Sequence, residues 1–219
     1  MVFLSVIGWS KSGKTTFIER LIPALRKRGM EVVTVKHHPE GGELDIPGKD
    51  TWRHRQAGAK GSMLLTPKGF SYVEDAPEET SLNKLRAIFG GADLVLVEGM
   101  KEGPFPKLEV YREELGKPPL AERVKGVIAI VTPDSLSVDL PLFRPDEEEK
   151  VVDFISERLI RNEKEKEIEM IADGKIVTLN PFVRGLLHRL IQAILLSLKG
   201  TEGVQEVTLY WRKVKDGKD

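Results

Sequence analysis

The chain has 219 residues, which is enough for one domain with a substantial core, or for one domain plus a small appendage. Its 34 Lys and Arg residues balance 34 Asp and Glu residues, so the net charge of +0 provides no overall field that would recruit nucleic acid or an anionic membrane, and we expect neither as a partner. There is no cysteine, which excludes disulfides, thiol catalysis and zinc-thiolate sites and fits a cytoplasmic protein.

The first predicted element is a strand over residues 2–7, an apolar run that is too short for a signal peptide. It leads directly into Gly8-Trp-Ser-Lys-Ser-Gly-Lys-Thr15, which has the glycine, lysine and threonine spacing of a phosphate-binding loop. The two glycines let the backbone turn so that its N–H groups point inward, where they can cradle phosphates. A glycine-rich turn between a strand and a helix is the plainer interpretation, but it does not explain why Lys and Thr follow the second glycine.

We therefore expect this loop and the start of the next helix to bind a nucleotide. Lys14 adds a charge near the β- and γ-phosphates, the hydroxyl of Thr15 can bind Mg²⁺, and the positive end of the helix favours the anion. The candidate binding residues here are Gly8, Ser10, Lys11, Ser12, Gly13, Lys14, Thr15 and Thr16.

The pair His37 and His38 follows the second predicted strand. A helix is predicted over residues 15–28 and a buried strand over 31–36, so a side chain just after this strand projects toward the phosphates. Adjacent histidines in an extended segment point to opposite faces and do not form a zinc pair by spacing. A phosphate or substrate role and a simple surface loop both remain open for them.

Two acids, Asp45 and Asp50, lie in the polar loop that comes next. Either could be a second Mg²⁺ ligand or position a water molecule. Asp50 also stands where it could cap a helix predicted over residues 51–57.

Glu98 ends another predicted buried strand, over residues 93–98, and is followed by Gly99. A hairpin of strands 62–66 and 70–74 and a helix over 78–89 come before it. An acid at the carboxyl end of such a strand completes the Mg²⁺ shell in phosphate-loop proteins, directly or through water. The alternative is an ordinary carboxylate at a strand end.

Asp134 follows a further predicted strand, over residues 127–131. The sequence Thr132-Pro133-Asp134 is reminiscent of the motif that reads guanine, although Pro replaces Lys and the spacing is one residue short. A carboxylate at this place can accept hydrogen bonds from the ring N1–H and the amino group of guanine. A plain Pro-Asp turn is the alternative.

Strands alternate with helices along the first part of the chain, and residues 108–111 and 147–161 add a strand and a helix. This pattern predicts an α/β fold, a P-loop NTPase-type, mostly parallel sheet with helices on both faces, over residues 1–162. After a charged run the pattern restarts, with a hairpin over 168–179, a helix over 182–198 and a strand over 206–211. These elements predict a small α+β, ββαβ-like extension over residues 163–219.

Charged residues make up 31% of the chain, with abundant Lys and Glu and few Asn and Gln. This bias is typical of proteins from thermophiles.

Several segments in order resemble the molybdopterin-guanine dinucleotide biosynthesis protein B family, MobB, over about residues 1–160. They are Gly8 to Thr16, Leu21-Ile-Pro-Ala-Leu25, Lys36-His37, Pro47-Gly-Lys-Asp50 before Arg55-Gln-Ala-Gly58, and Leu94-Val-Leu-Val-Glu98-Gly99. Met100 departs from the family, which often has an aromatic residue there, and the C-terminal extension lies outside the resemblance.

This resemblance implies a GTP-binding protein with weak intrinsic hydrolysis, often dimeric, that assists the nucleotidyltransferase attaching GMP to molybdopterin. It implies GTP and Mg²⁺ as cofactors, with Thr15, Asp50 and Glu98 around the metal and Lys36 and His37 near the nucleotide. It leaves open whether molybdopterin itself binds, and it assigns no catalytic residue.

Two other functions stay open at this point. One is an ATP-dependent small-molecule kinase or ligase related to dethiobiotin synthetase, whose acceptor would occupy the loop over residues 37–50. The other is a nucleotide-gated metal chaperone that uses His37 and His38. The motifs alone do not separate GTP from ATP.

Overall fold

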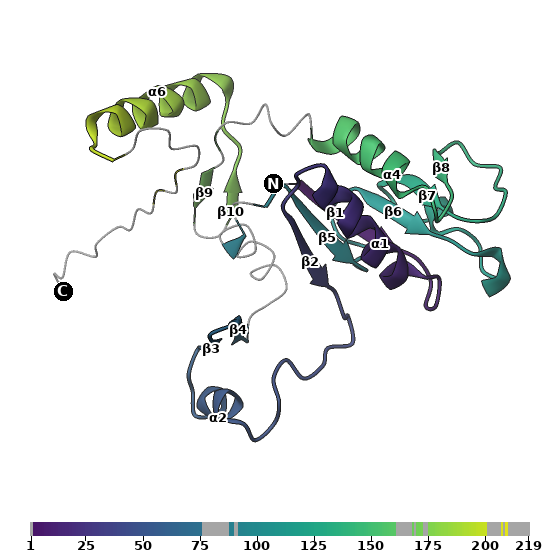
Figure 1. Ribbon diagram of the computed structural model, residues 1–219, viewed down its shortest axis with the longest axis horizontal. Coiled ribbons are helices and arrows are strands. Elements are labelled where there is room, and N and C mark those ends of the chain that lie inside the picture. Colours follow the sequence, from purple (N-terminus) through teal and green to yellow (C-terminus); the bar gives the residue numbers. More distant parts are fainter. Residues whose placement is uncertain are drawn as a thin grey trace. The chain divides into compact units, whose positions relative to one another are not determined.

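A computed structural model describes residues 2–75, 88–89, 92–160, 168, 170–172, 175–200, 207 and 209 (Figure 1). The chain divides into two compact units, residues 1–165 and 166–219. The division lies close to the boundary predicted after residue 162.

A six-stranded sheet forms the first unit, in the order β2-β5-β1-β6-β7-β8, and each of its neighbouring strand pairs is parallel (Figure 1). The strands are β1 (Val2–Ile7), β2 (Val32–Lys36), β5 (Leu94–Glu98), β6 (Lys107–Val110), β7 (Val127–Val131) and β8 (Leu142–Phe143). The predicted fold class is confirmed. The pattern analysis missed only the two-residue strand β8, which is too short to show a period.

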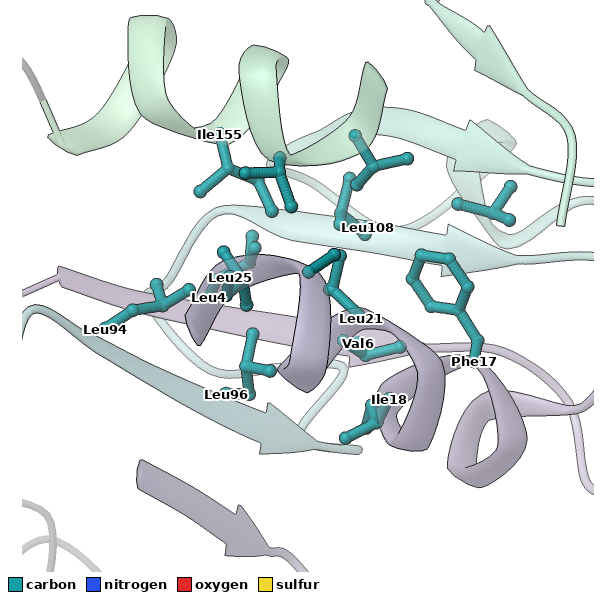
Figure 2. Packing of buried hydrophobic residues seen from close by; sticks show 14 of the residues in the cluster. Leu4, Val6, Phe17, Ile18, Leu21, Leu25, Leu94, Leu96, Leu108 and Ile155 are labelled. Carbon is teal, nitrogen blue, oxygen red and sulfur yellow. The ribbon is translucent and has the colours of Figure 1, made fainter. Parts of the chain in front are cut away.

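Helices α1 (Lys14–Lys27) and α4 (Glu148–Ile155) cover one face of this sheet, and α4 continues as a π-helical turn over Ser156–Ile160. Because side chains alternate along a strand, every second residue of each strand points into this layer. Figure 2 shows Leu4, Val6 and Leu96 of the strands packed against α1 and α4. This layer is the main core.

The opposite face of the sheet carries a smaller apolar cluster. Phe3, Val95 and Val97 of the strands pack there with Met100 and Phe105 of the loop after β5. The helix predicted over residues 78–89 lies outside the described residues, apart from its last two.

The segment between β2 and β5 contains α2 (Asp50–Gln56) and an antiparallel hairpin of β3 (Gly61–Thr66) and β4 (Gly69–Glu74). The hairpin confirms the prediction. Arg55 of α2 is almost buried and lies 3.9 Å from Asp45 and 2.8 Å from Asp75, so it links the loop, the helix and the end of the hairpin.

The interpretation of Asp50 as a helix cap is wrong. The helix begins at Asp50, its N-cap residue is Lys49, and no side chain makes a capping hydrogen bond there. The helix starts one residue earlier than the sequence indicated because Lys49 already has the extended backbone of a cap.

The second unit contains a hairpin of β9 (Met170–Ala172) and β10 (Lys175–Val177) and the helix α6 (Pro181–Ser197). Asn180 caps the helix, because its side chain accepts a hydrogen bond of 2.9 Å from the backbone N–H of Val183. The final strand predicted over 206–211 lies outside the described residues, apart from 207 and 209. In the part of the chain that the structure describes, no helix is both long and apolar enough to cross a membrane.

Leu96→Ala tests the main core. Leu96 is fully buried in the layer under α1, so we expect the substitution to lower the free energy of unfolding by about 2–5 kcal/mol in urea denaturation. Leu65→Ala is the matched control on an exposed strand, since Leu65 is 75% exposed, and we expect a change of at most about 0.5 kcal/mol. Equal losses for the two variants would contradict this description of the core.

Candidate nucleotide-binding site

The predicted phosphate-binding loop, residues 8–15, connects the carboxyl end of β1 to α1. A side chain at Gly8 would clash, because a Cβ atom there would lie 2.4 Å from the carbonyl oxygen of Val110. Gly13, immediately before the helix, has a φ of 93°, which side chains strongly disfavour. Both glycines of the motif are therefore required by the loop conformation.

The side chain of Lys14 folds back onto the loop that precedes α1. Its ammonium group donates to the carbonyl oxygens of Gly8 at 3.2 Å and Trp9 at 2.8 Å. Burial lowers the pKa of Lys14, the nearby charges of Lys36 and Lys101 lower it further, and Glu98 opposes them. A partly buried ammonium held in this way is suited to an anionic ligand.

Glu98 stands beside both the loop and β2. Parallel pairing sets it opposite Val6 of β1 and opposite Lys36 of β2. Its Oε1 accepts a hydrogen bond of 2.9 Å from the hydroxyl of Thr15 and another from the ammonium group of Lys36. The structure thus brings together three of the predicted site residues, from positions 15, 36 and 98.

The pKa of Glu98 is lowered overall. Burial alone would raise it, but the hydrogen bonds from Lys36 and Thr15 and the charges of Lys36 and Lys14 outweigh burial. An ionised carboxylate beside a threonine hydroxyl is an oxygen pair of the kind that Mg²⁺ binds. These two residues fit the predicted metal site.

Asp50, the third predicted metal ligand, is not in contact with the other two in the part of the chain that is described. Its side chain is 88% exposed, and its ion pair is a distant one of 4.0 Å with Arg53 of the same helix. Its role at the metal stays a prediction.

His37 continues the pairing of β2 with β5 by one residue, because its N–H donates to the carbonyl oxygen of Glu98 at 3.0 Å. Among the described residues there is no group of three or more His, Asp or Glu side chains arranged to hold a metal ion. A metal chaperone role of His37 and His38 stays a prediction.

Trp9, at the second position of the loop, is contacted by residues from two other loops. Its indole N–H donates to the carbonyl oxygen of Pro118 at 2.9 Å, and the ammonium groups of Lys101 and Lys117 each lie 4.5 Å from its ring centroid. The loops after β5 and β6 therefore both contact the phosphate-binding loop. Ser10 and Lys11 are exposed, and Ser12 is buried.

A small, open hollow of about 50 Å³ lies beside the loop, at the carboxyl ends of β6 and β7. Its walls are Ser12, Gly13, Thr16, Phe17, Arg20, Val110, Tyr111, Arg112, Val131, Pro133 and Pro145. In open α/β sheets, ligands bind at this edge.

Asp134, the predicted reader of guanine, is next to this hollow in sequence, and its carboxylate has protein partners. Its Oδ2 accepts from the N–H of Glu113 at 2.7 Å and lies 3.3 Å from the hydroxyl of Thr132. It thereby ties the end of β7 to the segment after β6. Guanine reading by Asp134 stays a prediction.

The sequence analysis missed Arg112. Its Nε donates to the carbonyl oxygen of Ser12 at 3.2 Å, which connects the segment after β6 to the phosphate-binding loop 100 residues earlier. Its place at the carboxyl end of a predicted strand was the one signal that could have indicated it.

Known proteins resemble the chain in sequence and in fold. The family model described as molybdopterin guanine dinucleotide synthesis protein B matches residues 3–133. The molybdopterin-guanine dinucleotide biosynthesis adapter protein of Haemophilus influenzae is 37% identical over 154 residues, which cover 69% of this chain and 86% of that protein. A putative adapter protein of the same description from Methanocaldococcus jannaschii is 25% identical over 233 residues, covering 94% of this chain and 96% of the relative. The crystal structure of Bacillus subtilis MobB has a TM-score of 0.55 at 30% identity and covers 72% of this chain and 97% of that one.

The pH dependence of stability tests the environment of Glu98. Because its pKa is lower in the folded chain than in the unfolded chain, its ionised form stabilises the fold above the ordinary glutamate pKa, and this stabilisation is lost as the pH falls through the folded pKa. We therefore expect the difference in unfolding free energy between the unaltered protein and Glu98→Gln to be larger at neutral pH than in acid. The measurement is urea denaturation of both proteins at a series of pH values from neutral to acid.

The control for this experiment is Glu19→Gln, on the exposed side of α1. A Glu98→Gln difference that does not change with pH would show that Lys36 and Thr15 do not favour the ionised carboxylate.

Proposed function

Since the chain belongs to the molybdopterin guanine dinucleotide synthesis protein B family, we propose that it is a Mg²⁺-dependent GTP-binding adapter protein in molybdopterin guanine dinucleotide biosynthesis. The observation that carries the proposal is the hydrogen bond between Thr15 of the phosphate-binding loop and Glu98 at the end of β5. It joins the two residues that a nucleotide-bound Mg²⁺ requires.

The loop supplies the phosphate contacts. Backbone N–H groups of the loop and of the start of α1 would face the anion, and Lys14 would add a charge near the β- and γ-phosphates. Lys36 shares the carboxylate of Glu98 and places a second ammonium group at the same edge of the sheet. This arrangement supports the binding of a triphosphate.

Mg²⁺ bound at this site would neutralise phosphate charge and orient the terminal phosphate. Thr15 and Glu98 would hold it, with Asp50 as a further candidate ligand, and water molecules would complete its shell.

Hydrolysis by the chain alone is expected to be slow. The sequence identifies no glutamine or arginine finger at a fixed motif position. Nucleotide hydrolysis without an arginine finger is slower by roughly 10³- to 10⁵-fold. A partner could supply such a residue.

The partner that we propose is the nucleotidyltransferase of the same biosynthesis, because relatives of this chain are named adapter proteins. We also propose that the protein acts in the cytoplasm as a homodimer. The charge balance of the whole chain supports a soluble role without nucleic acid.

Lys14→Ala tests the phosphate site. The substitution removes a charge that would contact the phosphates and removes no packing from the core, so we expect the protein to stay folded. Its Kd for GTP in the presence of Mg²⁺, measured by calorimetry, should rise roughly 10- to 150-fold. Lys125→Ala, at an exposed lysine away from the loop, is the control and should bind GTP like the unaltered protein. Unchanged affinity in Lys14→Ala would refute the phosphate assignment.

The adapter role is tested by association with the nucleotidyltransferase in size-exclusion chromatography. We expect a complex whose amount depends on GTP and Mg²⁺ and which Lys14→Ala weakens. Association that is the same with and without nucleotide would contradict a GTP-dependent adapter. ADP production that depends on a small-molecule acceptor would instead favour the kinase or ligase alternative.

A further inference from the structure

We propose that the hollow beside the phosphate-binding loop receives one edge of the nucleobase and that Arg112 selects guanine there. This inference rests on the proposed GTP binding and names the residue that would determine which purine is bound. It differs from the sequence prediction, which gave that role to Asp134.

The position of the hollow supports a nucleobase. Gly13 and Thr16 form one side of it, and these residues also belong to the loop that would bind the phosphates. The other walls are Tyr111 after β6, Pro133 after β7 and Pro145 after β8. A base attached through the ribose to phosphates in the loop therefore reaches this hollow without leaving the edge of the sheet.

The lining suits the polar edge of a flat ring. Phe17, Val131 and the two prolines supply apolar surface, which fits the usual composition of small-molecule sites with few polar groups. Arg112 supplies hydrogen-bond donors, and its side chain is 39% exposed, so it is open to a ligand.

Only some of the hydrogen-bond donors of Arg112 are used by the contacts found within the described residues. A guanidinium group carries five N–H donors. The N–H of Nε is used by the Ser12 carbonyl oxygen, and one N–H of Nη1 is directed at Glu114. Within the described residues no protein partner is found for the other three, one on Nη1 and two on Nη2, and N–H groups on neighbouring nitrogens of a guanidinium can act together as a fork.

The wall that carries Arg112 is fixed in place. The N–H of Glu113, the next residue, donates to Asp134 at 2.7 Å, and the Ser12 contact holds Arg112 itself against the loop. The fork is thereby oriented before a ligand arrives, which reduces the entropy lost on binding. Asp134 is thus a positioning residue for this wall.

The fork distinguishes the two purines. Guanine presents two acceptors, O6 and N7, on one edge, whereas adenine presents N7 and an amino donor on the same edge. Arg112 can donate to both acceptors of guanine, but with adenine one of its N–H groups would face the amino group. A bidentate pair of this kind is worth roughly 5- to 150-fold in discrimination against the wrong base.

Nucleotide analogues test the inference on the unaltered protein, by calorimetry in Mg²⁺. GTP should bind more tightly than ATP. Inosine triphosphate keeps O6 and N7 and lacks only the 2-amino group, so it should bind like GTP. 7-Deaza-GTP lacks N7 and should bind roughly fivefold more weakly or worse. If inosine triphosphate is the weak ligand and 7-deaza-GTP binds like GTP, the other edge of guanine is read and the inference is overturned.

Arg112→Lys is the second test, because it keeps the charge and removes the fork. We expect the preference for GTP over ATP to fall roughly 5- to 150-fold through weaker GTP binding, with ATP affinity close to that of the unaltered protein. Arg123→Lys, at an exposed arginine outside the hollow, is the control and should keep the preference. An equal loss for GTP and ATP would mean that Arg112 acts on the phosphates or on the loop, and would overturn the inference.

The two proposals fail differently. If the unaltered protein binds neither GTP nor ATP, the proposed function fails and this inference with it. If GTP binds and depends on Lys14, but the analogues and Arg112→Lys leave the purine preference unchanged, only the inference about Arg112 fails.

Discussion

The parallel register of β2, β5 and β1 is the constraint on which the site depends. Glu98 is paired with Val6 and with Lys36, so the three strands end at one edge of the sheet. Because side chains alternate, Glu98 lies on the same face as Leu96, the face that α1 covers. The first turn of α1 carries Thr15, so the carboxylate meets the hydroxyl there. A slip of one residue in β5 would turn Glu98 to the opposite face and separate the two.

A second set of polar contacts holds the segment after β6 against the phosphate-binding loop. Glu109 is fully buried and accepts hydrogen bonds from the N–H groups of Leu120 at 2.6 Å and Ala121 at 2.8 Å. Burial raises the pKa of Glu109 although these two bonds lower it, so the contact stabilises the segment at a cost in desolvation. The segment fixed in this way carries Arg112 and Pro118 to the loop. A buried carboxylate within the sheet therefore supports groups at the edge of the sheet.

Local sequence signals predicted most of the sheet and the centre of the site. The phosphate-binding loop and Glu98 could be recognised because their spacing to a strand is short and fixed by the chemistry of phosphate and metal binding. The contact of Arg112 with Ser12 could not, since it joins residues 100 positions apart and has no periodic pattern. The register that aligns Lys36 with Glu98 is likewise a product of sheet order, which no single segment encodes. The start of α2 at Asp50 was misjudged by one residue because Asp is common both as a cap and in a first turn.

The environment of Lys14 fits a loop organised for an anionic ligand rather than for stability. Its ammonium group is partly buried, and the neighbouring cations Lys36 and Lys101 oppose its charge, with Glu98 as the compensating anion. The two loop carbonyl oxygens hold it in place but supply no full negative charge. A fold selected for stability alone would not keep such a group there, because removing a charge from water is costly unless it is paired. A polyphosphate would supply the missing charge, so the unfavourable electrostatics of the loop become favourable when the anion binds.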